Sequence, residues 1–123
     1  MIRSFLLKLS GEALAASEQE IISPSMLKAY SDEIECAIKN QVGIAVVVGG
    51  GNYFRGASLQ SSGIERVIAD KMGMLATLMN GLALTDFMRQ KGMNVEIYHS
   101  SSIDGVVGPY NSCLLYTSDA ADE

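Results

Sequence analysis

The chain has 123 residues, of which 48% are hydrophobic and 19% are charged, and its formal net charge at pH 7 is −5. This length fits one domain with a buried core, the acidic balance argues against a broad nucleic-acid surface, and no continuous apolar run reaches the length of a membrane span. Because Lys8 interrupts the apolar start and no small-residue cleavage site follows, we expect no secretory signal and a cytoplasmic protein.

Two elements are predicted in the first part of the chain. Ile2–Leu9 is a short apolar run that predicts a buried strand. Ser23 and Pro24 then predict a helix start, because serine caps free backbone amides and proline suits the first helical position. Apolar residues recur at helical spacing over 26–42, and Gly43 is expected to end this helix.

The middle of the chain predicts a second strand and a long helix. Ile44–Val48 is a continuous apolar run, typical of a parallel strand covered on both faces. Ser62-Gly63-Ile64-Glu65 has the capping-box pattern of a helix start. From about Asp70 to Lys91 the pattern is helical and apolar over most of its girth. This indicates burial against more than one neighbour, in the core or at a subunit interface.

A third strand is predicted over Val95–Tyr98, after Gly92 closes the long helix. Ser100–Gly108 follows as a polar loop that contains glycine. The order strand, helix, strand, helix, strand implies an α/β fold, with a parallel sheet, right-handed crossovers and helices on its faces.

Residues 113–123 differ in character from the rest of the chain. Their reverse translation resembles the transposon-end adapter of sequencing libraries read through in frame, so we interpret them as a non-native tail. A genuine acidic tail is the alternative. We therefore expect 1–112 to be the native part, the N-terminal portion of one domain, and we rest no functional argument on Cys113 or on the acidic end.

Cysteine and histidine predict neither a metal site nor a disulfide framework. Cys36 and Cys113 lack metal-ligand spacing, and His99 is the only histidine of the chain. Ser/His/Asp chemistry would need His99 to find partners, whereas a solvated histidine at a strand end is the simpler interpretation. No metal ligand from the protein is predicted.

Lys8 is the first candidate site residue. In open α/β sheets, ligands bind beyond the carboxyl ends of the strands, and Lys8 lies near the end of the first predicted strand. A buried lysine is costly unless its ammonium reaches water or an anion, and its compact charge suits a phosphate. An edge-strand lysine that extends to solvent is an equal alternative.

Gly49–Gly56 is the second candidate, a loop directly after the second predicted strand. Its three successive glycines let the backbone approach a ligand closely and leave amide N–H groups for phosphate oxygens. Arg55 adds a permanent cation that binds phosphate in a fork. A tight turn with a surface arginine is the alternative, but the combination favours phosphate handling. A Walker A loop is excluded because Ala57 replaces the essential lysine, and a Rossmann pattern because Phe54 replaces the third glycine.

Asp70 is the third candidate, predicted at the opening of the long helix. An acid is favourable near a helix N-terminus, which is a sufficient reason for its presence. It could also accept hydrogen bonds from ligand hydroxyls, and the periodicity does not choose between these two interpretations.

Three segments closely resemble the bacterial uridylate kinases, a branch of the amino-acid kinase family. They are Leu6–Leu14, Val46–Gly56 and Arg66–Ala83. The first is moderately specific, because lysine and glycine near a first strand occur across the superfamily, whereas the third is particular to uridylate kinases. The resemblance covers most of Ile2–Asn111, about the first half of such an enzyme. It implies a three-layer α/β sandwich with a mainly parallel sheet.

The resemblance also implies an activity, the transfer of the γ-phosphate of ATP, as its Mg²⁺ complex, to UMP. The product is UDP, in de novo pyrimidine nucleotide synthesis. Lys8 and Arg55 would be catalytic, and the UMP-binding residues would be Gly50 and Asp70, the latter through ribose hydroxyls. The ATP-binding residues would be Lys8, Leu9, Ser10, Gly11, Gly51 and Arg55. A homohexamer is expected at full length, with no nucleic-acid or membrane partner.

The resemblance has two limits. Ala15–Ile22 lacks the glycines that family members often carry there in a segment associated with GTP activation. The other half of such an enzyme would hold further UMP contacts and the adenine pocket, so we expect the polypeptide alone to be inactive. The rival interpretations are a family member that phosphorylates a carboxylate or carbamate, and a nucleotide-binding storage or regulatory protein on the same fold.

Overall fold

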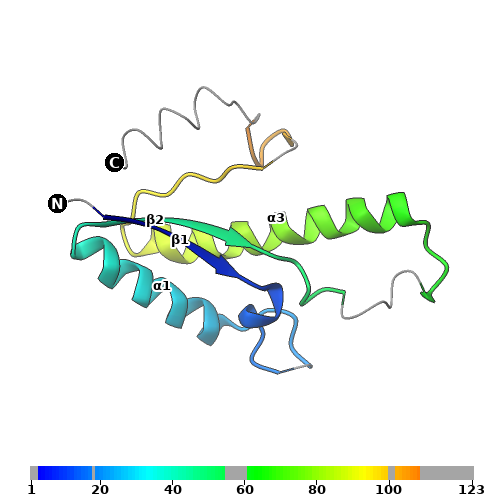
Figure 1. The fold of residues 1–123 in the computed structure, drawn as a ribbon, viewed down its shortest axis with the longest axis horizontal. Helices are drawn as coiled ribbons and strands as arrows, with labels where there is room; N and C mark the ends of the chain where they lie inside the picture. Colours follow the sequence, from blue (N-terminus) through cyan, green and yellow to red (C-terminus); the bar gives the residue numbers. More distant parts are fainter. Residues whose placement is uncertain (1–2, 18, 55–60, 100–101, 109–123) are drawn as a thin grey trace.

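The computed structural model describes residues 3–17, 19–54, 61–99 and 102–108. Figure 1 shows the elements in chain order: the strand β1, the 3-10 turn η1, the helix α1, the strand β2 and the long helix α3. Their bounds are Arg3–Leu9 for β1, Gly11–Leu14 for η1, Pro24–Lys39 for α1, Val42–Val48 for β2 and Arg66–Gln90 for α3.

The two strands pair in parallel along their whole length, with Arg3 opposite Val42 and Leu9 opposite Val48. Helix α1 lies between them in the sequence and carries the chain back to the start of the sheet (Figure 1). The predicted α/β fold with parallel strands is therefore confirmed. A further consequence of this pairing is that the carboxyl ends of β1 and β2 lie at one edge of the sheet.

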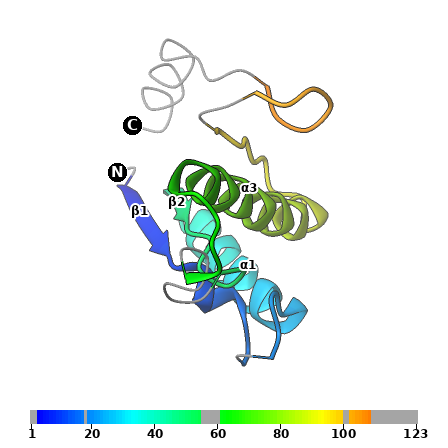
Figure 2. The same ribbon diagram turned by 90° about the vertical axis from the view of Figure 1, so that its right-hand side faces the viewer.

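The hydrophobic core lies between one face of the strand pair and the two helices. Figure 2 shows α1 and α3 on the same side of β1 and β2. Alternate strand residues turn to this side because side chains alternate between the two faces of a sheet. The buried core residues are Leu9, Leu14, Leu27, Ile34, Leu84 and Met88, with Leu7, Ile44, Val46 and Val48 packed against them.

The opposite face of the sheet is open. Leu6 is 61% exposed and Val47 is 52% exposed, and Lys8 lies on the same face because it follows Leu6 by two residues. Within the described ranges the helices thus cover one face only, giving two layers of the three that the resemblance implies. Several apolar residues of α3 are exposed as well: Val67, Ile68, Met74, Leu75 and Met79.

Helix α3 is also long and apolar enough, by length and composition alone, to cross a membrane, with a mean hydropathy of 1.3 over its most apolar window. This is weak evidence, since core helices of globular proteins pass the same test. The helix contributes Leu84 and Met88 to the core, and it buries the polar Asn80 completely. These features are those of a helix that packs on a sheet.

Helix α1 begins as predicted and ends earlier than predicted. The Ser23 hydroxyl accepts a hydrogen bond from the Met26 amide at 3.4 Å, and Pro24 is the first helical residue. The helix ends at Lys39, and Gln41 takes the left-handed conformation that reverses the chain, with φ of 63°. The expected role of Gly43 was therefore wrong, because Gly43 lies inside β2 opposite Ser4.

Helix α3 begins at Arg66, so the capping-box prediction over Ser62–Glu65 was wrong. Glu65 is the N-cap and its side chain makes no capping hydrogen bond. At the other end Gly92 closes the helix as predicted, with φ of +87°. The Gly92 amide donates to Arg89 O at 2.9 Å and the Met93 amide to Met88 O at 3.2 Å, which is a Schellman motif.

The third strand predicted over Val95–Tyr98 was wrong, since these residues form no strand in the described part. Instead, the guanidinium of Arg89 donates two hydrogen bonds to the Val95 carbonyl, at 3.2 and 2.7 Å. A ring nitrogen of His99 lies 3.3 Å from Met74 O, so His99 is partly buried beside α3 rather than simply solvated. Helix α3, not the sheet, binds this segment.

Candidate active site

The carboxyl ends of the two strands bring the lysine segment and the glycine loop together. Lys8 lies opposite Val47 in the register, and the Gly49 amide donates a hydrogen bond to Leu9 O at 2.8 Å. The chain leaves both strands at this point (Figure 1). Ser10 and Gly11 lie beside Gly49–Gly51. Two segments about forty residues apart in sequence, each a candidate from its residue pattern, therefore form one junction.

Glycine is required at this junction because the backbones approach closely. A methyl group added at Gly11 would lie 2.6 Å from Asn52 Oδ1 and 2.8 Å from the Gly50 carbonyl carbon. A methyl group at Gly50 would lie 2.8 Å from Ala76 Cβ and 3.1 Å from the Thr77 nitrogen, both in α3. The loop is thus packed between the β1 end and α3, and side chains are excluded at Gly11 and Gly50.

The same loop offers free backbone donors. In the described part of the chain, the amide N–H groups of Gly50 and Gly51 donate no hydrogen bond. The neighbouring amides do: that of Gly49 donates to Leu9 O, and that of Tyr53 donates to Gly50 O. Two successive unused amides in a glycine turn can donate hydrogen bonds to an anion such as a phosphate. Close packing of these glycines does not exclude a phosphate cradle, because the amides of Gly50 and Gly51 remain unused.

A buried pair of asparagines fixes this loop, and the sequence interpretation missed it. Asn52 is 3% exposed and Asn80 is 0% exposed. Asn80 Nδ2 donates to Asn52 Oδ1 at 2.7 Å, and Asn52 Nδ2 donates back to Asn80 Oδ1 at 3.1 Å. Both residues lie in the motifs that carry the family resemblance. The signal available was Asn80 itself, a polar residue in the most apolar part of α3.

Tyr53 follows this pair and is partly buried, and the burial raises the pKa of its phenol above the ordinary value. It is therefore neutral at pH 7 and supplies no charge to the site. Its ring packs beside that of Phe54, with the ring centres 6.4 Å apart.

The predicted ATP-binding residues of β1 differ in how they face the junction. Lys8 and Ser10 are exposed, and within the described ranges Lys8 forms no ion pair, so its ammonium is available to an anion. Leu9 has its side chain in the core and its carbonyl bonded to Gly49, so it contributes to the position of the loop. Gly11 is buried against the loop.

Asp70 lies in the second turn of α3, not at its opening as predicted, since the helix begins at Arg66. It is exposed and precedes Gly73 by about one turn, and the Gly73 carbonyl lies 3.2 Å from the position of a methyl group added at Gly50. The two predicted UMP-binding residues, Gly50 and Asp70, are therefore carried by neighbouring parts of the loop and α3. The benefit of an acid at the very end of the helix does not explain Asp70.

Two predictions remain outside this geometry. Arg55 lies outside the described residues, as does the 113–123 tail. Among the described residues, no group of three or more histidine, cysteine or acidic side chains could hold a metal ion. The carboxylate of Glu12 lies against Gly51, next to the junction, as a single acid.

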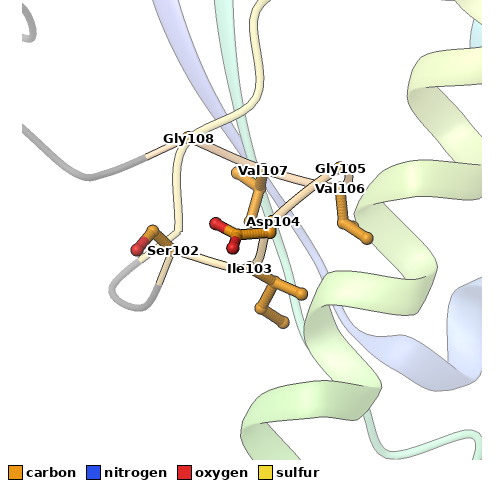
Figure 3. Close-up of a pocket in the computed structure, with 7 residues that line it drawn as sticks. All are labelled: Ser102, Ile103, Asp104, Gly105, Val106, Val107 and Gly108. Carbon is orange, nitrogen blue, oxygen red and sulfur yellow. The ribbon is translucent and has the colours of Figure 1, made fainter.

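A separate hollow lies on the turn Ser102–Gly108 (Figure 3). Ile103 and Val107 exchange two backbone hydrogen bonds across this turn, of 2.9 and 3.0 Å. All the lining residues belong to this one turn, and Asp104 is the only charged residue among them. No residue of the strand-end junction lines the hollow, and one acid on a tight turn gives no basis for a site.

The chain is similar to known uridylate kinases over most of its length. It is 50% identical to the uridylate kinase of Alcanivorax borkumensis over 106 residues, which are 86% of this chain and 42% of that protein. It is 45% identical to the uridylate kinase of Mannheimia succiniciproducens over 109 residues, 89% of this chain and 46% of that protein. The chain thus spans about half the length of the curated relatives that it matches.

The fold of the chain is also similar to those of solved UMP kinase structures. The UMP kinase of Ureaplasma parvum matches with a TM-score of 0.88 and 26% identity, over 100% of this chain and 52% of that one. The UMP kinase of Bacillus anthracis matches with a TM-score of 0.88 and 30% identity, over 98% of this chain and 50% of that one. The model of the amino acid kinase family matches residues 3–120. The chain therefore belongs to the amino acid kinase family.

Proposed function

We propose that the chain is the N-terminal part of a UMP kinase, which transfers the γ-phosphate of ATP to UMP and gives ADP and UDP. The observation that carries this proposal is the junction at the strand ends. There, two unused amides of Gly50 and Gly51 lie beside the segment of Lys8, and α3, the helix that carries Asp70, packs on Gly50. The identity of 45–50% to uridylate kinases supports UMP as the acceptor.

In this proposal the residues divide between the two nucleotides. Lys8 neutralises charge on the transferring phosphoryl group, because its ammonium is exposed and unpaired in the described part. Ser10, Gly11 and Gly51 line the path of the ATP phosphates, and Leu9 fixes that path from the core side. Arg55 follows the loop in sequence and adds a second cation where donor and acceptor phosphates meet.

The acceptor is bound on the α3 side of the junction. Gly50 packs on α3 and its amide is unused, so it can face the UMP phosphate. The Asp70 carboxylate is exposed on the same helix and can accept hydrogen bonds from the ribose hydroxyls. Phosphoryl transfer needs positioning and charge stabilisation without a covalent intermediate on the enzyme, which suits a site of amides and cations.

The metal enters as part of the substrate, the Mg²⁺ complex of ATP. Mg²⁺ commonly keeps several waters and is held by substrate phosphates together with one or two carboxylates. We further propose that the whole enzyme is cytoplasmic and forms a homo-oligomer, a hexamer as in the family. The exposed apolar residues of α3 are consistent with a covered interface.

Two other functions are possible on this fold, and one assay separates them. The intact enzyme, extended to the length of its relatives, is incubated with ATP and with UMP, a carboxylate or a carbamate, and ADP release is measured. UMP kinase activity predicts ADP release that requires UMP. Release with another acceptor only would contradict the proposal, and nucleotide binding without any turnover would indicate a storage or regulatory protein.

Arg55→Ala tests the residue assignment in the same assay. Loss of the cation at the transferring phosphate should lower kcat at least about a hundredfold. Arg3→Ala is the matched control, because Arg3 is exposed at the opposite end of β1 and should leave kcat unchanged. Equal kcat values for the two variants would refute the role of Arg55 even if the acceptor were UMP.

A further inference from the structure

The asparagine pair next to the glycine loop joins three segments of the chain. Asn52 is in the loop itself and Asn80 is in the middle of α3. Besides their mutual bonds, Asn52 Nδ2 donates to Ile21 O at 2.7 Å, and Asn80 Nδ2 donates to Gly49 O at 2.7 Å. The pair therefore connects the loop, α3 and the segment that leads into α1.

The hydrogen bonds of the pair are complete. Each carboxamide has two N–H donors, and all of them are used: one by the partner asparagine and one by a backbone carbonyl. No buried side-chain polar atom of the described part lacks a partner. Two buried amides of this kind are costly unless satisfied, so their geometry tolerates little movement of the groups they bind.

The effect of the pair falls on the orientation of the glycine loop. Asn80 binds the carbonyl of Gly49, and Asn52 Oδ1 lies where any side chain at position 11 would have to go. Because glycines alone leave the backbone free to rotate, the sequence Gly49–Gly51 cannot fix its own conformation. A contact that holds the first carbonyl of the loop against α3 limits the directions in which the next two amides can point.

We propose that Asn52 and Asn80 together are the positioning residues of the phosphate loop, holding Gly49–Gly51 so that the Gly50 and Gly51 amides stay available to phosphate oxygens. They act through the loop and do not touch the nucleotide. This inference rests on the proposed function for the ligand of the loop. The conformational part of it, the hold on the loop, can be measured independently.

The test uses the 123-residue chain labelled with ¹⁵N, with inorganic triphosphate as the probe. Asn80→Leu removes the donors and leaves Asn52 unsatisfied, whereas Asn52→Leu/Asn80→Leu replaces the pair by apolar groups of similar shape. Asn40→Leu is the matched control, since Asn40 is an exposed asparagine whose amide binds Cys36 O at 2.8 Å on α1. Three quantities are measured: urea unfolding midpoints, amide exchange rates, and resonance shifts of Gly50 and Gly51.

We expect Asn80→Leu to accelerate exchange at the hydrogen-bonded amides of Gly49 and Tyr53 about tenfold more than at Leu27 and Ile34 of α1. The double variant should recover the unfolding midpoint toward that of the wild type. It should not restore the slow exchange of the loop amides, and its apparent affinity for triphosphate should stay at least about fivefold weaker than that of the wild type. Asn40→Leu should leave the loop amides and the triphosphate response unchanged.

Equal acceleration at the loop and α1 amides would overturn the proposal, because the pair would then contribute only to general stability. A double variant with wild-type loop exchange and triphosphate response would overturn it as well. If the Gly50 and Gly51 resonances of the wild type do not respond to triphosphate, the phosphate role in the proposed function fails. In that case the exchange rates alone decide whether the pair holds the loop.

Discussion

Gly50→Ala should destabilise the chain, because the glycine loop is packed directly on α3. The added methyl carbon would lie 2.8 Å from Ala76 Cβ and 3.2 Å from Gly73 O, while ordinary contact begins at 3.4 Å. The loop would have to move several tenths of an ångström away from α3 and would strain the bond of 2.7 Å from Asn80 to Gly49 O. Overpacking of this kind costs about 1–3 kcal/mol of unfolding free energy.

Gly73→Ala is the matched control for this variant. Nothing lies within 4 Å of a methyl group added at Gly73, which is inside α3. Alanine is the better helix former there, so stability should rise by about 0.5–1 kcal/mol. Urea unfolding followed by circular dichroism measures both free energies. The reasoning is refuted if Gly50→Ala unfolds at the same urea concentration as the wild type, or at a higher one than Gly73→Ala.

Three further predictions concern contacts away from the junction. Lys91 and Lys28 hold the pKa of Asp32 below its usual 3.8, and Asp32 in turn raises the pKa of Lys91 above 10.5. The contribution of the Asp32 carboxylate to stability is therefore fully present above pH 3.8 and is lost as the pH falls through the lowered pKa of Asp32. The difference in urea midpoint between the wild type and Asp32→Asn should shrink below pH 3.8, and a difference that stays constant would contradict this prediction. Gly92→Ala should lower the free energy of unfolding by about 1–2 kcal/mol, because Gly92 has φ of +87°, and an unchanged melting temperature would refute this. Leu84→Ala should cost about 2–5 kcal/mol, because Leu84 is 1% exposed in the core, and a loss below about 1 kcal/mol in urea unfolding would show that the core is not packed as described.

The elements that carry strong local signals could be predicted from the sequence. Ser23 followed by Pro24 marks a helix start through local hydrogen bonding and fixed backbone geometry, and the structure confirms it. The helix end at Gly92 is an equally local signal, since it requires only a residue that readily adopts the left-handed backbone conformation. The apolar strand Ile44–Val48 was found because burial of a parallel strand requires continuous apolar residues, although β2 begins at Val42.

The errors arose where longer-range contacts decide the structure. Val95–Tyr98 has the residues of a strand, but the Val95 carbonyl is bound by Arg89 and forms no ladder in the described part. Gly43 looked like a helix stop, yet Gln41 takes the left-handed position. Such choices depend on partners that a local pattern does not contain.

The candidate site was predictable in part. Strand topology brings Lys8 and Gly49–Gly51 to one edge of the sheet, which follows from parallel pairing of the two predicted strands. The link from the loop to α3 through Asn52 and Asn80 was not predictable, because it joins residues 28 positions apart through side-chain amides. Arg55 keeps its role as a prediction.

The most direct test of the central claim is the KM for UMP of the Asp70→Ala variant, measured in the intact enzyme next to the KM for ATP. Asp86→Ala is the control, since Asp86 is an exposed acid on the same helix, far along α3 from the junction. We expect Asp70→Ala to raise the KM for UMP at least about tenfold and to leave the KM for ATP within about twofold. Equal KM values for UMP in the wild type and both variants would contradict a role of Asp70 in UMP binding.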